Sequence, residues 1–197
     1  MKIRHIACTA LALCLTTSTI LLAVSPEESG TASEKLDRIS RSEMNPGEQI
    51  TLTESEINSF LQYDYAVLIP AGVENLQVRL HQDVAVVSGQ VDFSRIGPAE
   101  DTATRLLLMM LPGQHAFVAR VRYVSSGGQA RADVDSLLVD GQELKGMILD
   151  WIVKNYVATD LAGFALGQPI SLGNNLEQIR LEPGQAIIVA PSTQAQR

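Results

Sequence analysis

Few side chains in this 197-residue chain combine the types and spacing that catalysis requires. His81 is expected beside a turn and His115 at the start of a strand, where a solvated or hydrogen-bonded histidine is the simpler interpretation. Asp133 and Asp135 lie on one face of a predicted strand, roughly 6.6–6.8 Å apart, a separation that general acid–base catalysis could use. However, Arg120 is expected opposite Asp133, and charges paired across an open sheet face need no catalytic role.

Sequence motifs for nucleophilic, metal-dependent or nucleotide-dependent catalysis are absent from the chain. HExxH, GxSxG, SxxK, GxGxxG and the P-loop pattern do not occur. The sequence therefore predicts a protein that is not an enzyme and that uses neither a metal nor a cofactor.

The charge balance argues against a nucleic-acid partner. The chain has 15 basic and 22 acidic residues, a formal net charge of −7. Removal of a leader that contains Lys2 and Arg4 would leave 13 basic residues against 22 acidic ones, a net charge of −9. An acidic surface repels phosphate backbones, so binding to DNA or RNA is not expected.

Residues 1–23 have the pattern of a secretory signal peptide: a basic start, an uncharged apolar stretch and small Ala23 before the expected cleavage point. An uncleaved anchor is the alternative, because the uncharged stretch is nearly long enough to cross a bilayer. The protein is thus predicted to be periplasmic or extracellular, either free or tethered to the inner membrane. Cys8 and Cys14 both lie in this segment, which leaves the remaining chain without disulfides.

The rest of the chain is interpreted as one domain with short flanking segments. Residues 24–48 are polar and are predicted to form a spacer, with a short helix over residues 34–44. Residues 49–190 form a single α+β domain, and residues 191–197 a frayed tail. Within the domain, Thr53 and Glu56 have the spacing of a capping box. The helix that follows is predicted to bury Ile57, Phe60 and Leu61.

Three hairpins are predicted from alternating apolar residues and turn signals. A two-residue loop at residues 82–83 pairs His81 with Val84 and Val78 with Val87. A turn at residues 125–128 is expected to set Tyr123 opposite Ala130 and Arg120 opposite Asp133, with Arg122 facing Arg131. The third hairpin turns at residues 182–185, where Pro183 and Gly184 indicate a type II turn.

Two apolar segments, residues 101–111 and 143–157, are predicted to be helices. The second is apolar over most of its circumference and needs cover on more than one side. The predicted fold is therefore a curved antiparallel β-sheet, built from hairpins, that wraps this long apolar helix, with additional short helices. The run Leu106–Leu111 is interpreted as a helix buried in the core; the alternative is an exposed apolar tip that enters a bilayer surface.

The order of several segments carries a resemblance to a known group. These are TLTESEINSFL (51–61), VENLQVRL (73–80), VSGQVDF (87–93), the hairpin and helix of 115–157, and LEQIRLEPGQAIIV (176–189). Together they resemble the tubular lipid-binding (TULIP-like) superfamily, in particular small bacterial envelope members related to the mycobacterial lipomannan elongation factor. The resemblance implies a long, bent antiparallel sheet around a helix, with an apolar channel for acyl chains, and it assigns no site residue.

The sequence thus favours a non-catalytic exported protein that holds or transfers a lipid or an isoprenoid-linked envelope component, with a membrane surface as a further partner. The alternative is a scaffold or accessory subunit of an envelope export or assembly machine. The residues predicted to line the lipid groove are Phe60, Leu61, Val78, Val87, Phe93, Phe117, Val121, Met147 and Trp151.

Overall fold

The computed structural model describes residues 24–66, 69, 71–95, 111–146, 149 and 167–192. Within these residues a large sheet contains β2 (Val73–His81), β3 (Val84–Asp92), β4 (Gln114–Ser126), β5 (Gln129–Val139), β6 (Gln142–Leu144) and β7 (Ile170–Ser171). A small sheet contains β1 (Gln49–Thr53), β8 (Gln178–Glu182) and β9 (Gln185–Val189). The helices are α1 (Pro26–Ser40), α2 (Glu54–Tyr63) and the 3₁₀ turn η1 (Phe93–Arg95).

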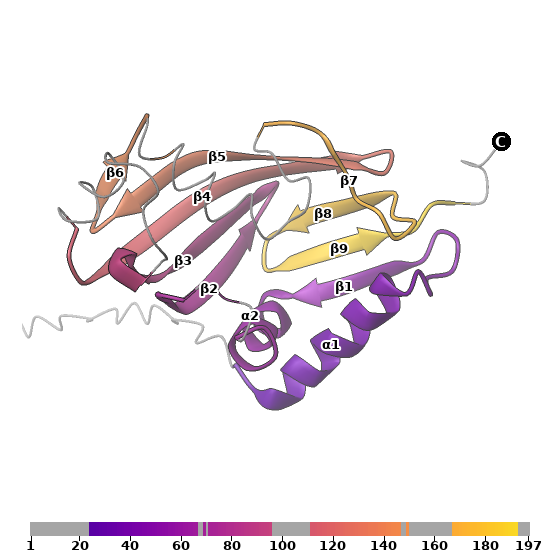
Figure 1. Ribbon diagram of the computed structural model, residues 1–197. Coiled ribbons are helices and arrows are strands. Elements are labelled where there is room, and N and C mark those ends of the chain that lie inside the picture. The colour runs from indigo at the N-terminus through magenta and orange to yellow at the C-terminus, as the bar shows by residue number, and fades with distance from the viewer. Residues whose placement is uncertain are drawn as a thin grey trace, which may run out of the picture.

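Both sheets are antiparallel. The large sheet has the order β2-β3-β4-β5-β6, with β7 paired to the start of β5, and the small sheet has the order β1-β9-β8. Figure 1 shows α1 lying along the small sheet and α2 at the edge of the large sheet, beside β2. The prediction of an α+β fold built from antiparallel hairpins is confirmed, with strands predominating in the described residues.

The polar spacer predicted over residues 24–48 is wrong, because α1 is part of the domain. The helix begins after Ser25, whose hydroxyl accepts a hydrogen bond from the Glu28 N–H at 3.2 Å, and Pro26 occupies its first turn. It therefore begins at Pro26 rather than at residue 34, and it ends at Ser40. The start signal was present in the sequence, in the Ser-Pro-Glu-Glu run of residues 25–28.

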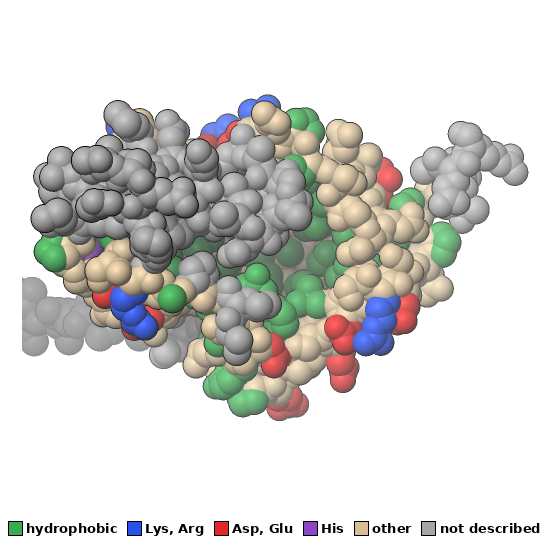
Figure 2. Space-filling view, viewed as in Figure 1, with side chains coloured by type: hydrophobic (Ala, Val, Ile, Leu, Met, Phe, Trp, Pro, Cys, Tyr) green, Lys and Arg blue, Asp and Glu red, His purple; other side chains and the backbone are tan. Residues whose placement is uncertain are grey.

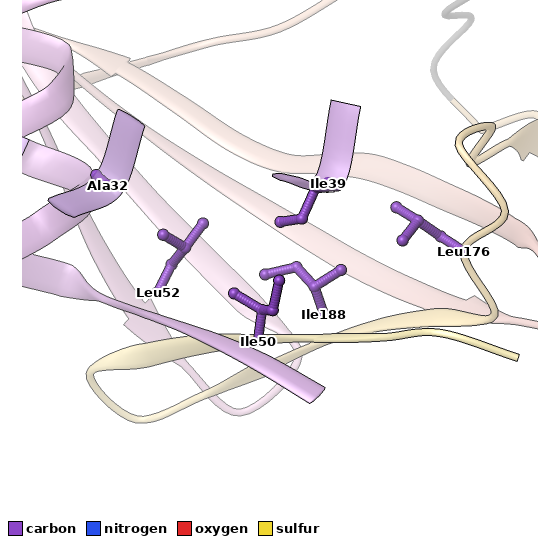
Figure 3. Close-up of a cluster of buried hydrophobic side chains, with 6 residues drawn as sticks. All are labelled: Ala32, Ile39, Ile50, Leu52, Leu176 and Ile188. Carbon is purple, nitrogen blue, oxygen red and sulfur yellow. The ribbon is translucent and has the colours of Figure 1, made fainter. Parts of the chain in front are cut away.

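The apolar side of α1 completes a core against the small sheet. Buried side chains from the helix, from β1, from β9 and from the loop before β8 meet in one cluster (Figure 3). Its members are Ala32, Ile39, Ile50, Leu52, Leu176 and Ile188. This burial stabilises a helix that would be marginal in isolation.

The capping box predicted at the start of α2 is confirmed. The Thr53 hydroxyl accepts from the Glu56 N–H at 3.1 Å, and the Glu56 carboxylate accepts from the Thr53 N–H at 2.9 Å. The predicted apolar face is only partly correct: Ile57 and Phe60 pack half-buried against the small-sheet core. The most buried residues of α2 are instead polar, namely Glu56, Asn58 and Ser59.

Those polar side chains attach α2 to the edge of the large sheet. Asn58 accepts a hydrogen bond from the Val78 N–H at 2.7 Å and donates one to the Val78 carbonyl at 2.8 Å. The Glu54 carboxylate accepts from the Leu80 N–H at 2.7 Å. The side chains of α2 thus replace a neighbouring strand along β2, which protects an edge that would otherwise be open to pairing.

The first and third predicted hairpins are confirmed in register. Val78 pairs with Val87 and His81 with Val84 around a two-residue turn, in which Asp83 has φ 56°. Glu182 pairs with Gln185 around a turn in which Gly184 has φ 78°. In both cases the alternation of apolar residues determined the register correctly.

The predicted register of the second hairpin is wrong. Gly127 and Gly128, with φ 58° and 73°, form a two-residue turn that pairs Ser126 with Gln129. Consecutive glycines accept the positive φ of this tight turn without strain. The two strands therefore continue up to the glycines, and the turn is shorter than predicted. Tyr123 faces Ala132, and Arg122 rather than Arg120 faces Asp133.

The start of the predicted helix over residues 143–157 is also wrong. Asp140 and Gly141, with φ 49° and 77°, form a hairpin turn that returns the chain as β6. Asp-Gly between apolar strands is a strong hairpin signal, and it outweighs the helical pattern that follows it. Beyond β6, only Lys145, Gly146 and Leu149 of that predicted helix are described, and a curved sheet around a long apolar helix is not shown.

The three remaining sequence predictions of local structure fall mostly on residues that the structure does not describe. Of residues 101–111 only Leu111 is described, and it packs half-buried against the cluster of Val91, Phe93 and Val139. The predicted signal peptide (residues 1–23) lies outside the described residues, as do residues 193–197 of the predicted tail.

Candidate functional site

One face of the large sheet, here called the inner face, is apolar across neighbouring strands. Strand register sets its residues in rows that run across β2, β3, β4 and β5. The first row is Val78, Val87, Ala119 and Leu137, and the second is Leu80, Ala85, Val121 and Val134. Phe117 lies in the next row of β4, opposite Gly89 and Val139.

This face is fully buried at some positions and only partly covered at others. Leu80 and Leu137 are 4% and 7% exposed, whereas Val78, Val87, Phe117 and Val121 are only half-buried. Figure 2 shows hydrophobic side chains gathered in a hollow where α2, β8 and β9 meet the large sheet. An apolar surface that remains partly accessible in the folded domain is a candidate binding site.

The structure brings some of the predicted groove residues together and separates others. Val78, Val87, Phe117 and Val121 share the inner face. Phe93 is buried at one end of it and packs in a cluster that includes Phe117.

Two of the other predicted groove residues, Phe60 and Leu61, lie on α2. Phe60 packs against the small-sheet core, with its ring centroid 5.8 Å from that of Tyr65. Leu61 is half-buried on α2. Met147 and Trp151 lie outside the described residues.

Gly89 allows the Phe117 ring to lie across β3. A Cβ atom at residue 89 would be 3.0 Å from both the Phe117 ring and the Glu74 carbonyl oxygen. Alanine at this position is therefore expected to lower the free energy of unfolding by about 1–3 kcal/mol, measured by urea denaturation.

Gly30→Ala is the matched control for that substitution. Residue 30 lies within α1 with no atom within 4 Å of an added Cβ, so alanine there should stabilise the protein by about 1 kcal/mol. Equal effects of the two substitutions would contradict the close packing at Gly89.

A histidine–aspartate pair stands at one end of the inner face. His115 precedes Phe117 on the same side of β4, and its Nδ1 is 2.7 Å from the Asp140 carboxylate. The other Asp140 oxygen accepts from the Ala116 N–H at 3.0 Å. The hydrogen bond from His115 and that from the Ala116 N–H hold the pKa of Asp140 below its ordinary value. The Asp140 carboxylate therefore remains ionised at neutral pH.

Tyr123 and Ser125 lie at the other end of β4, where the large sheet meets the small one. Burial raises the pKa of the Tyr123 hydroxyl, although hydrogen bonding to Ser125 opposes the effect. The Ser125 hydroxyl donates to the Ile179 carbonyl at 2.7 Å and accepts from the Ile179 N–H at 2.8 Å. These bonds fix the end of β4 to β8.

No family model matches the chain. No curated protein and no solved structure matches it either. The candidate site is therefore defined by the structure alone. It consists of the inner face, the His115–Asp140 pair at one end and Tyr123 with Ser125 at the other.

The other residues considered for chemistry are placed elsewhere. Asp133 and Asp135 form ion pairs with Arg131 and Arg122, at 2.9 Å and 2.8 Å. His81 is exposed at the end of β2. Among the described residues, no group of His, Cys, Asp and Glu could hold a metal ion.

Several residues of the site were missed from the sequence. Ala119 and Val134 follow the same alternation as Val121, so the corrected register of β4 and β5 would have included them. Asp140 could have been placed through the Asp-Gly turn signal.

None of the helices in the described ranges has the length and apolarity needed to span a bilayer.

Proposed function

We propose that this chain binds the hydrocarbon chain of a lipid or isoprenoid on the inner face of the large sheet, as a non-catalytic carrier. The observation that carries the proposal is the apolar inner face itself, on which Val78, Val87, Phe117 and Val121 are only half-buried. Covering apolar surface with a hydrocarbon is worth about 25 cal/mol per Å² of area removed from water.

The shape of this face suits an extended ligand. Phe117, Ala119, Val121 and Tyr123 alternate along one side of β4, a distance of roughly 20 Å from first to last at strand rise. The cross-strand rows widen this strip over β2, β3 and β5. A compact solute would leave most of the strip exposed, whereas a long alkyl chain could cover it.

The sequence supports the same proposal in two ways. Residues 1–23 resemble a signal peptide, which would export the protein to the periplasm or beyond. The order of segments resembles TULIP-like lipid-binding proteins.

Opposite faces of β4 offer a matched pair of variants for testing the proposal. Val121 lies on the inner face, and Val118 lies on the outer face with 40% exposure. Val121→Asp is expected to weaken binding of a fluorescent fatty acid at least tenfold, because a buried charge opposes an apolar ligand. Val118→Asp should leave the affinity unchanged. Titration of the purified full chain provides the measurement, and circular dichroism shows whether each variant is folded.

A second variant tests the site without a charge. Ala119→Met adds volume to the strip and should reduce the affinity for long chains. The protein should also carry a lipid when it is purified from the envelope of the cells that make it. Solvent extraction followed by mass spectrometry should recover that lipid. The proposal would be overturned if the titration detects no binding and the extraction recovers no lipid. Equal affinity of the Val121→Asp and Val118→Asp proteins would also overturn it.

A scaffold function is the second candidate, and the outer face of the large sheet favours it. Val118 and Val124 are 40% and 49% exposed there. Arg79 and Arg120 lie nearby with no ion pair to any residue in the described ranges. A photo-cross-linker at position 118 should trap one envelope protein repeatedly if this face docks a partner, whereas a carrier would give no single product.

A further inference from the structure

The His115 imidazole has one nitrogen that the protein leaves unsatisfied. Nδ1 contacts the Asp140 carboxylate at 2.7 Å, while Nε2 is buried without a hydrogen-bond partner in the described part of the chain. The side chain as a whole is 14% exposed. Buried polar atoms are nearly always paired, so this nitrogen at the edge of an apolar site is a candidate position for a hydrogen-bonding group of a ligand.

The surroundings of His115 fix the orientation of the ring. Its Cα lies opposite Val91 in β3, and its ring centroid is 6.0 Å from that of Phe93. The Asp140 carboxylate can only accept hydrogen bonds when ionised, so Nδ1 carries the proton that it shares with Asp140. Nε2 is then the ring nitrogen that is left to bond another molecule.

His115 lies at one end of the apolar strip that runs along β4. His115 and Phe117 are successive residues on the same side of β4, and Ala119 and Val121 follow. A hydrocarbon chain lying along that strip would have one end beside His115. No other described residue of β4 on this side, before Tyr123, has a polar side chain.

We propose that His115, oriented by Asp140, is the anchor for the polar end of the bound chain, and that its Nε2 hydrogen-bonds a hydroxyl or carboxyl head group. This inference rests on the proposed function, because it requires a hydrocarbon chain on the inner face. The ligand class is therefore a long-chain alcohol or acid rather than a pure hydrocarbon.

Three probes of equal chain length test the anchor: dodecanoic acid, dodecan-1-ol and dodecane. In the full chain, His115→Phe keeps an aromatic ring beside Phe93 but removes both nitrogens. It is expected to weaken binding of the acid and the alcohol by about three- to tenfold and to leave dodecane binding unchanged. His81→Phe, which alters an exposed histidine of the same sheet, should change none of the three affinities.

A second measurement needs no variant and applies if His115→Phe does not fold. The ¹⁵N resonance of Nε2 in the unaltered protein should shift when the alcohol or the acid is added, and should not shift with dodecane. Unchanged affinities in His115→Phe, or an unchanged Nε2 resonance, would overturn the anchor while dodecane binding still supports the carrier function. Failure of all three probes to bind the unaltered protein would overturn both.

Discussion

Asn58→Leu is expected to lower the free energy of unfolding by about 2–4 kcal/mol. Leucine has nearly the same shape as asparagine but cannot bond to the Val78 N–H or the Val78 carbonyl, which Asn58 contacts at 2.7 Å and 2.8 Å. Both backbone groups would remain between α2 and β2 without a partner. Each unsatisfied buried group costs about 1–3 kcal/mol. Urea denaturation followed by circular dichroism measures the loss.

Hydrogen exchange locates the same effect within the structure. In the unaltered protein the Val78 amide should be protected, and in Asn58→Leu it should exchange faster than the amides of β4. Gln62→Leu makes the same kind of substitution at an exposed position of α2 and is expected to change stability by less than about 0.5 kcal/mol. Equal losses in the two variants would show that Asn58 does not replace a neighbouring strand.

The contact between Asn58 and β2 could not be predicted from the sequence, whereas the hairpins could. Alternation fixed the register of β2 with β3 because a shift by one residue would expose Val78 and Leu80. By contrast, the local partner of Asn58 is the Glu54 carbonyl of its own helix, and its role at the sheet edge appears only when β2 is brought beside it. Polar residues that bond across elements leave no periodic signal.

The errors also have local physical causes. The turn at Gly127 and Gly128 was taken to be longer than it is, which moved every pair of β4 and β5. The apolar residues after Glu143 were interpreted as one helix, although Asp140 and Gly141 form a turn that pairs β6 with β5. In both places a two-residue turn signal outweighed the longer pattern next to it.

The candidate site was predictable to the extent that it depends on alternation. Val78, Val87, Phe117 and Val121 were assigned to one surface because each lies at an alternating apolar position, and strand pairing brings them together. Phe60 was assigned to the same surface from its place on the predicted apolar face of its helix. The helix that carries Phe60 faces a different core, and only tertiary packing decides that.

Glu56→Ala is the other substitution with a large expected effect, a loss of about 2–4 kcal/mol in the free energy of unfolding. The Lys35 ammonium contacts the two Glu56 carboxylate oxygens at 2.6 Å and 2.8 Å and also donates to the Thr51 carbonyl at 2.8 Å. The side chains of Lys35 and Glu56 are 29% and 11% exposed, so alanine would leave a largely desolvated cation without its counter-charge. The capping box of α2 would be lost as well.

Two comparisons separate these contributions. Glu56→Gln can retain the capping box, so its smaller loss should report the missing charge alone. Addition of Lys35→Met to Glu56→Gln should recover most of that loss, because removing both partners of a buried ion pair is often nearly neutral. Asp37→Ala breaks an exposed pair with Arg41 on α1, with both side chains about two-thirds exposed, and should cost less than about 0.5 kcal/mol.

The pH dependence provides an independent test of the Glu56 charge. Burial raises the pKa of Glu56, but the hydrogen bonds from Lys35 and the Thr53 N–H outweigh it and hold the pKa below its ordinary value of 4.5. A carboxylate with a lowered pKa stabilises the folded protein above the ordinary value, and that stabilisation is lost as the pH falls through the lowered one. The stability difference between the unaltered protein and Glu56→Gln should thus be constant above pH 4.5 and narrow below it. A difference that is the same in acid and at neutral pH would mean that the side-chain geometry of Glu56, rather than its charge, holds α1 against α2.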